Sequence, residues 1–344
     1  MDKKIILPPE WHPQSAVQLT WPNEATDWQP VLDEVAAVYT NLAREIVKHE
    51  KLITVCNSEA EARRRLQGID FDKVIFRTMD YNDTWARDHA GITVFLDEKP
   101  VIYDFVFNGW GMKYPANLDN LITRRLAETK TFHKDVEVVN MQPFVLEGGS
   151  IESDGKGTIL TTAKCLASVN RNEYLNKEEI ECHLKNFFGA KRILRLENGY
   201  LQGDDTDGHI DTLARFCNEN TIAYVKCADS TDEHYEELKA MEDELKAFRT
   251  LDGKPYSLVP LPMADEIIDR EEDIRLPATY ANFLIINDAV IMPFYGSHKD
   301  AIAKQKLQNA FPHRNITGID SRILLKQHGS LHCVAMQFPE GVVV

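Results

Sequence analysis

Apolar residues recur every three or four positions in four segments of the chain, which is the spacing of helices that bury one face. After Pro30, positions 31, 35, 38, 42 and 46 are all Val, Leu or Ile. Similar stripes lie within 176–189, 230–248 and 298–311. We therefore expect four amphipathic helices, the last of which should stop before Pro312, because proline cannot continue a helix.

Polar residues predict where two of these helices begin. Asn176 is followed three residues later by Glu179, and Ser230 by Glu233, which is the spacing of a capping box. Gly189 follows the first of these two stripes and is expected to close that helix.

Short runs rich in Val, Ile, Leu and Phe separate the helical stripes and predict strands. They lie at 16–20, 52–55, 74–76, 101–105, 136–139, 159–162, 222–225, 283–286 and 290–292. Strands and helices alternate throughout, and no Ser/Gly-rich linker interrupts them. We therefore predict an α/β fold and one catalytic domain that spans residues 1–344.

The composition is typical of a globular protein. The 344 residues are 43% hydrophobic, which is enough to bury a core. All apolar runs are far shorter than the ~20 residues of a membrane span, so no membrane association is expected. Residues 1–9 contain only three consecutive apolar residues, too few for a signal peptide. We expect a cytoplasmic protein with six reduced cysteines.

Acidic residues outnumber basic ones, and the formal net charge is −15. Such a surface repels phosphate backbones, so nucleic acid is not an expected partner. It would attract a small basic substrate, although acidity can also serve only to keep a protein soluble. Nothing in the sequence settles the oligomeric state, so a homo-oligomer stays open.

Four polar motifs can carry chemistry: NDTWARD at 82–88, LEGGS at 146–150, GHID at 208–211 and HGSLHCVAM at 328–336. The GHID motif places an imidazole and a carboxylate two residues apart, so on an extended segment both would point to the same side. In the last motif, Cys333 is placed like a nucleophile presented by a strand.

One candidate residue from each of five regions is spaced almost regularly. Asp88, Glu147, His209, Asn282 and Cys333 are separated by 59, 62, 73 and 51 residues, and 344 residues divided by five is about 69. The stretches share negligible sequence identity, so the spacing alone is weak evidence of an internal repeat.

Together the motifs resemble those of the guanidine-modifying enzymes, and within them the agmatine deiminase branch, which also contains a bacterial peptidylarginine deiminase. The likeness extends from Trp11 to Met336. It implies a five-bladed, pseudo-symmetric α/β propeller (the pentein fold) with the active site at its central axis. One polar motif for each blade would explain the regular spacing.

The resemblance also implies a role for each catalytic candidate. Asp88 and Asp211 would clamp the guanidinium, whose planar fork of N–H donors matches carboxylates. Cys333 would attack the guanidinium carbon. His209 would protonate the departing ammonia and then deprotonate a water molecule. Glu147 would hold His209 or contact the reacting nitrogens.

Three further residues, Trp85, Trp110 and Asn282, are expected to bind the substrate. The two tryptophans would wall a long, narrow pocket, with ordinary core packing as an equal alternative. The segment FNGWGMK at 107–113 differs from many relatives, which carry alanine before the Trp and a second glycine in place of Met112. This difference leaves the lining of the pocket in question.

We therefore expect a hydrolase that converts agmatine to N-carbamoylputrescine and ammonia through a covalent Cys333 thiouronium, with no metal or organic cofactor. The alternatives are a deiminase of arginine or peptidyl-arginine and a non-catalytic protein that binds guanidines or amines. An arginine deiminase would need a cationic group for the substrate carboxylate, and no such group stands out in the sequence, although Arg171 and Arg275 are unassigned. A peptidyl-arginine enzyme would need an open cleft.

A zinc site is a different class of interpretation. His328, His332, Cys333 and His209 are the side chains that could form it. His332 and Cys333 are adjacent, however, and on a strand they would point to opposite faces. We therefore do not expect this set to bind a metal.

Overall fold

The computed structural model describes residues 4–271 and 273–344. The four predicted helices are all present, as α1 (Leu32–His49), α7 (Lys177–Phe188), α8 (Tyr235–Ala247) and α9 (Lys299–Ala310). The apolar stripe of α1 is buried against the sheet that contains β2 (Gln14–Thr20) and β3 (Lys51–Cys56). Within the described residues, no helix combines the length and hydropathy that crossing a membrane requires.

The capping box of α7 is confirmed. Asn176 Oδ1 accepts a hydrogen bond from the backbone N–H of Glu179 at 2.9 Å, and the Glu179 carboxylate accepts one from the backbone N–H of Asn176 at 2.8 Å. Gly189 then closes the helix with a left-handed φ of 63°. These interactions satisfy backbone groups that a helix end otherwise leaves unpaired.

The capping box predicted at Ser230 and Glu233 is wrong. Residue 234 precedes the first residue of α8, and its side chain makes no cap. The Asp229 carboxylate instead accepts a hydrogen bond from the Thr231 backbone N–H at 2.9 Å. This local side-chain bond forms a turn that competes with helix formation and delays the start of α8.

Five sheets in the described part of the chain share one topology. In each, a first strand pairs antiparallel with a second, and the second pairs parallel with a third. In this order the strands are β5 (Ile92–Leu96), β6 (Lys99–Val106) and β7 (Glu137–Val145); β8 (Ile151–Ser153), β9 (Thr158–Thr162) and β10 (Arg192–Leu196); β11 (Ala214–Asn218), β12 (Thr221–Lys226) and β13 (Ser257–Pro262); β16 (Leu284–Ile286), β17 (Ala289–Phe294) and β18 (Asn315–Asp320); and β19 (Ala335–Pro339), β2 and β3.

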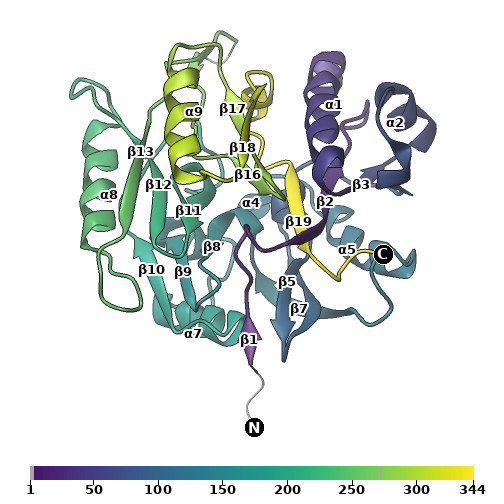
Figure 1. The fold of residues 1–344 in the computed structure, drawn as a ribbon, viewed down its shortest axis with the longest axis horizontal. Coiled ribbons are helices and arrows are strands. Elements are labelled where there is room, and N and C mark those ends of the chain that lie inside the picture. The colour runs from purple at the N-terminus through teal and green to yellow at the C-terminus, as the bar shows by residue number, and fades with distance from the viewer. Residues whose placement is uncertain (1–3, 272) are drawn as a thin grey trace.

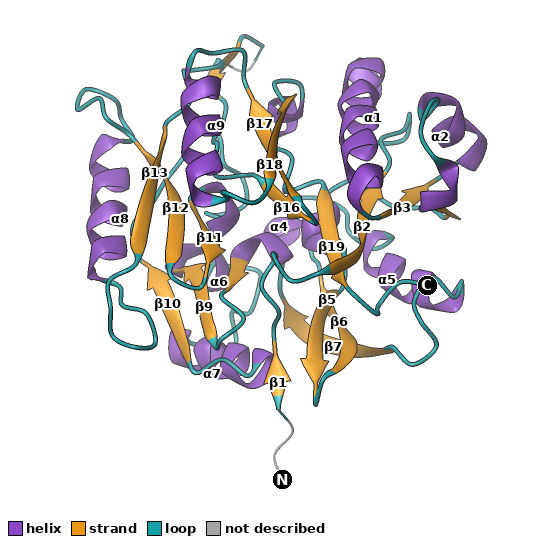
Figure 2. Cartoon of the chain, in the orientation of Figure 1, coloured by secondary structure: helices purple, strands orange, loops and turns teal. Residues whose placement is uncertain are grey.

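A helix connects the second and third strands of every one of these sheets, because parallel neighbours need a crossover connection. The five crossover helices are α5 (Ile122–Glu128), α7, α8, α9 and α1. Figures 1 and 2 show α8 on the left edge, α7 at the lower edge and α1 at the upper right, with the strands between them. The fold is therefore mixed α/β, as predicted.

Four short strands complete the sheets. β1 (Ile5–Ile6) extends the sheet of β5, and β4 (Val74–Thr78) extends the sheet of β3, whereas β14 (Ile268–Asp269) and β15 (Ile274–Arg275) pair with each other. Several third strands were not predicted, among them β10 and β18. Their sequences, RILRL and NITGID, mix polar and apolar residues because these strands are only partly buried.

The two ends of the chain meet in one sheet. β19, near the C-terminus, pairs antiparallel with β2, near the N-terminus, with Ala335 opposite Leu19. This pairing places the segment that carries Cys333 beside the rest of the fold.

One candidate site residue lies just before the first strand of each of the five sheets. Asp88 precedes β5, Glu147 precedes β8, Asp211 precedes β11, Asn282 precedes β16 and Cys333 precedes β19. The intervals are two to four residues. The near-regular spacing in the sequence therefore reflects repeated topology, with one polar motif before each first strand.

Two local predictions at these positions were wrong. Residues 210–212 form a 3₁₀ turn, so His209 and Asp211 do not lie on an extended segment. Cys333 lies in a turn that ends at β19, two residues before the first residue of the strand rather than on it. In both cases a turn, not a strand, presents the side chain.

Gly189 provides a test of the fold. A Cβ at this position would lie 2.0 Å from the Ile5 carbonyl oxygen, and φ is left-handed. Gly189→Ala should therefore lower the free energy of unfolding by more than the ~1 kcal/mol that a left-handed alanine costs alone. Gly253→Ala is the matched control, because Gly253 also has a positive φ but no neighbour within 4 Å. Equal losses in urea unfolding would contradict the proposed packing of residue 5 against the end of α7.

Candidate active site

The Asp88 carboxylate is held in a fixed orientation by two N–H groups. It lies in the short helix α3 (Ala86–His89). The Gly149 backbone N–H donates to Oδ1 and the Trp110 indole N–H donates to Oδ2, each at 3.0 Å. Asp88 is only 4% exposed, so these bonds replace most of its contact with water.

Gly149 marks the point where the site residues meet. A Cβ at this glycine would lie 2.5 Å from His209 Nδ1, 2.9 Å from Asp88 Oδ1 and 3.2 Å from Asp211 Oδ2. Three side chains from two distant motifs therefore surround one backbone position, and only glycine leaves room for them. The Glu-Gly-Gly motif thus provides space as well as a carboxylate.

His209 lies between two carboxylates. Its Nδ1 is 3.6 Å from Asp88 Oδ1, and its Nε2 is 3.8 Å from Glu147 Oε2. Burial lowers the pKa of the imidazole, but the Asp88 charge and contacts with Cys165 and Glu147 raise it, and the net pKa is well above its ordinary value. The imidazolium is therefore the favoured form, which is the form that can donate a proton.

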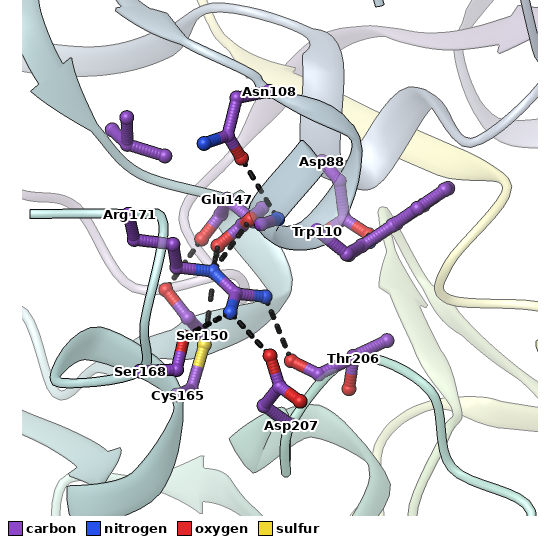
Figure 3. Close-up of polar contacts among 12 residues, drawn as sticks. Asp88, Asn108, Trp110, Glu147, Ser150, Cys165, Ser168, Arg171, Thr206 and Asp207 are labelled. Atoms are coloured by element: carbon purple, nitrogen blue, oxygen red, sulfur yellow. Dashed lines mark hydrogen bonds and ion pairs between the residues drawn. The ribbon is translucent and has the colours of Figure 1, made fainter. Parts of the chain in front are cut away.

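Arg171 holds Glu147, and the sequence did not reveal this (Figure 3). Its Nε donates to Oε1 and Oε2 of Glu147 at 2.9 and 3.1 Å, and its Nη1 donates to Asp207 at 2.5 Å. Burial raises the pKa of Glu147, but His209 and Arg171 lower it more, so the net shift is downward. Glu147 is therefore a buried carboxylate that stays charged.

A second group of buried charges lies behind Asp211. Asp211 Oδ2 contacts His332 Nδ1 at 2.7 Å, His332 Nε2 contacts Glu10 at 2.8 Å, and Glu10 pairs with Arg215 at 2.5 Å. Arg215 also pairs with Glu152. Burial raises the pKa of Asp211, but the hydrogen bond and charge of His332 lower it by more. The net shift is downward, so this carboxylate also stays charged.

Cys333 is positioned by Asn282. The Asn282 Oδ1 accepts hydrogen bonds from the backbone N–H of His332 at 2.9 Å and from the Cys333 thiol at 3.5 Å. Asn282 Nδ2 donates to the Asp211 carbonyl oxygen at 3.3 Å. Asn282 is fully buried and lies beneath the Cys333 turn, whereas we had expected it to contact the substrate directly.

Cys333 and Asp88 line one cavity of about 190 Å³. Trp85 and Trp110 form part of its wall, with their rings edge to face at 6.4 Å. Both rings also belong to the hydrophobic core, so these tryptophans line the cavity and pack in the core at the same time. Met112 is 73% exposed and is not part of this wall, which answers the question that its position in the sequence raised.

The cavity contains more carboxylates than the sequence suggested. Besides Asp88, its lining includes Asp27, Asp83 and Asp205, with Lys326 as the one lysine among the described lining residues. Burial, with help from Asp211 and Glu147, raises the pKa of Asp88 to about 6, and burial raises the pKa of Asp83 to about 7. A cation bound here would relieve the cost of charging these groups.

The zinc site considered from the sequence is not assembled. His332 contacts Asp211 and Glu10, while His328 Nδ1 contacts the Gly203 carbonyl oxygen at 2.7 Å. Among the described residues, two other groups bring metal-binding atoms together: Glu147 with Cys165 and His209, and Glu10 with Glu152 and His332.

The sequence profile of the Porphyromonas-type peptidyl-arginine deiminases matches residues 6–339. The chain belongs to this family. Its fold is similar to that of a protein from Porphyromonas gingivalis provisionally named an arginine deiminase, with 52% identity, a TM-score of 0.95 and coverage of 99% of this chain and 100% of that one.

Two further family relatives carry the name agmatine deiminase. One is the C. jejuni enzyme, solved as a Cys-to-Ser variant with substrate bound, at 39% identity and a TM-score of 0.92 over 99% of this chain and 98% of that one. The other is the enzyme of Ectopseudomonas mendocina, 29% identical over 97% of this chain and 95% of its own length.

The charge network of this family member gives a stability prediction. Arg215→Met would leave Glu10 and Glu152 buried without their cation, and we expect a loss of about 3–5 kcal/mol in the free energy of unfolding. Arg64→Met is the matched control. Its solvent-exposed pair with Glu61 should contribute little to stability, because water and salt screen exposed ion pairs. Comparable losses for both variants in urea unfolding at pH 7 would show that the network does not depend on Arg215.

Proposed function

We propose that the chain hydrolyses the guanidinium group of agmatine to give N-carbamoylputrescine and ammonia. The observation that carries this proposal is one narrow acidic cavity in which the Cys333 thiol and the Asp88 carboxylate both lie on the wall. The family relatives named agmatine deiminase support the same reaction.

Asp88 and Asp211 form the guanidinium clamp in this proposal. Both carboxylates lie near the same backbone position, at Gly149, and Asp211 Oδ1 has no hydrogen-bond partner among the described residues. A guanidinium presents paired N–H donors that match such acceptors. Its charge also offsets the repulsion between two nearby carboxylates.

Bound substrate helps to activate the thiol. Burial, followed by the charges of Asp211 and Asp88, raises the pKa of Cys333 well above its ordinary value. Since a cation between the two carboxylates cancels much of their effect, substrate binding favours the thiolate at the moment when it is needed.

The thiolate adds to the guanidinium carbon and forms a tetrahedral adduct. His209, as the imidazolium, gives its proton to the leaving nitrogen, the C–N bond breaks, and ammonia and an S-alkylthiouronium result. The neutral imidazole then takes a proton from water as the water oxygen adds to the same carbon. When the C–S bond breaks, the hydroxyl proton of the adduct passes to the departing thiolate, which restores the Cys333 thiol and releases the ureido product. Glu147, held by Arg171, keeps His209 in place.

The lining of the cavity favours a substrate that also carries a primary amine. Asp27, Asp83 and Asp205 line it together with Asp88, and Lys326 is the one lysine among the described lining residues. Arg171 and Arg275, which the sequence left unassigned, are paired with Glu147 and Asp207 and with Asp232, respectively, so neither is available to bind a substrate carboxylate.

A comparison of substrates tests the proposal. Agmatine, arginine and an arginyl peptide blocked at both ends are incubated with the protein, and the ureido product is measured. We expect kcat/KM for agmatine to exceed that for the other two by at least about tenfold, or about 1.4 kcal/mol. A higher value for arginine or the peptide would assign the chain to that substrate, and no product from any of them would favour a binding protein.

Three broader proposals accompany this function. The five sheets of like topology are best explained as the five blades of a propeller that forms one catalytic domain over residues 1–344, with the site residues at its axis. The product is a precursor of putrescine, which points to polyamine biosynthesis. Because the mechanism needs Cys333 as a free thiol, the reducing cytoplasm is the compartment that suits it.

Replacing Cys333 tests the nucleophile. Cys333→Ser and Cys333→Ala should abolish turnover while agmatine still binds within a few-fold of the wild-type affinity, because the carboxylate clamp is intact. Kinetics and calorimetry measure the two effects. The exposed thiol of Cys182 is the control, and Cys182→Ser should keep full activity. Near-normal ammonia release by either Cys333 variant would rule out the mechanism.

Asp88→Asn and Asp211→Asn preserve shape but remove charge. We expect kcat/KM on agmatine to fall roughly 10²-fold or more, as when a preorganised electrostatic partner is lost. Thermal melts should show that both variants fold. Activity within a few-fold of wild type would instead make these carboxylates structural.

Asn282→Ala separates positioning from direct substrate binding. Asn282 holds the Cys333 turn and is absent from the cavity lining, so its loss should reduce kcat for agmatine more than tenfold and change KM less than threefold. The reverse pattern, a raised KM with normal kcat, would show that Asn282 contacts the substrate after all.

A further inference from the structure

Three metal-binding atoms meet on the side of His209 that faces away from Asp88. His209 Nε2 is 3.8 Å from Glu147 Oε2, and the Cys165 Sγ is 3.9 Å from the same oxygen. All three atoms lie within 4.8 Å of one another, and all three residues are buried. Figure 3 shows Cys165 next to Glu147 and Arg171. We propose that His209, Glu147 and Cys165 form an inhibitory site for a zinc-like divalent cation.

The distances suit tetrahedral coordination. Zinc binds nitrogen and carboxylate oxygen at about 2.0–2.2 Å and sulfur at about 2.3 Å, so neighbouring ligand atoms are roughly 3.3–3.7 Å apart. The two separations to Glu147 Oε2, 3.8 and 3.9 Å, exceed these values by only a few tenths of an ångström, and the third pair, His209 with Cys165, lies within 4.8 Å. Imidazole and thiolate donors favour zinc, cobalt or copper over magnesium or calcium. A water molecule would supply the fourth ligand.

An independent observation points to the same site. His209 Nε2 has no hydrogen-bond partner among the described residues, although the side chain is only 1% exposed. Its other nitrogen, Nδ1, faces the Asp88 carboxylate at 3.6 Å. A histidine that presents one nitrogen to a carboxylate and the other to open ligand atoms is typical of metal centres, where the carboxylate orients the ring.

The charges around the site limit its affinity without excluding the cation. Binding would displace one proton from the Cys165 thiol and one from the His209 imidazolium, so a divalent ion replaces two protons and the net charge is unchanged. Arg171 would keep its bond to Glu147 Oε1 and leave Oε2 to the metal. Because this guanidinium stays nearby, its repulsion should make the site weaker and more reversible than a structural zinc site.

The metal site itself does not depend on the proposed function; only the inhibition that follows from metal binding rests on it. A metal on Nε2 would prevent His209 from moving protons between the leaving nitrogen and water, so the cation should inhibit turnover. This inhibition would be independent of Cys333, which is not a ligand in the proposed set.

Cobalt(II) binding to the Cys333→Ala variant tests the site directly, because this variant has no nucleophile that could bind the metal. We expect one equivalent of Co²⁺ to bind, with the thiolate-to-cobalt charge-transfer band and the visible bands of a tetrahedral site. The double variant Cys333→Ala/Cys165→Ala should lose the charge-transfer band. Its affinity should fall by more than the roughly 10–100-fold that loss of an outer-shell partner costs.

The control is Cys333→Ala/Cys182→Ser, which removes the exposed thiol and should leave the spectrum unchanged. Persistence of the band after loss of Cys165, or absence of any cobalt–thiolate band in Cys333→Ala, would overturn the site. Far-ultraviolet circular dichroism of the three variants shows whether a lost band reflects unfolding. For an unfolded Cys165→Ala protein, the conservative Cys165→Ser variant takes its place.

A second measurement concerns inhibition. Zn²⁺ should inhibit wild-type turnover of agmatine, and a chelator should restore it. In Cys165→Ser, inhibition expressed relative to that variant's own activity should need at least tenfold more Zn²⁺. Equal sensitivity would overturn the inhibitory role. If no guanidine is turned over, the proposed function fails while the cobalt measurement still decides the metal site.

Discussion

The side chains of Asp88, His209 and Asp211 meet around the backbone of Gly149, and this crowding of charge is the constraint on which the structure depends. Glu147 is a third carboxylate in this region, and its Oε2 lies 3.8 Å from the imidazole of His209. In a poorly hydrated interior, like charges at such distances repel strongly, and an unpaired charge is costly. The site can therefore exist only if its surroundings supply matching cations.

The three carboxylates do not receive equal compensation from positively charged groups, and this difference determines the chemistry of the site. Arg171 pairs with Glu147, His332 contacts Asp211 at 2.7 Å, and the pKa of each carboxylate is lowered, so both stay charged. Asp88 receives two neutral N–H donors and faces the His209 imidazole at 3.6 Å, and burial still raises its pKa to about 6. Its charge is therefore only partly offset by these neighbours, and its carboxylate borders the cavity. The same balance that stabilises the fold therefore favours a cationic ligand next to Cys333.

The repeated topology explains how one chain can bring these residues together. Each polar motif lies in the turn before a first strand, where side chains are not committed to the face of a sheet. The sheets are rigid, whereas the turns tolerate 3₁₀ geometry and glycine. The pairing of β19 with β2 closes the arrangement, because it joins the Cys333 turn to the start of the chain. A rigid scaffold that carries its functional groups on short loops is a common solution in enzymes.

The sequence by itself determined the features that depend on near neighbours. The stripes of α1, α7, α8 and α9, the capping box of α7 and the polar motifs could all be recognised because their signals repeat within a few residues. Only the tertiary structure decided which charges are paired. Arg171 and Glu147 are 24 residues apart, and His332 and Glu10 are 322 apart. No local pattern encodes such contacts, since they arise only when separate sheets bring distant side chains into one buried, poorly hydrated volume.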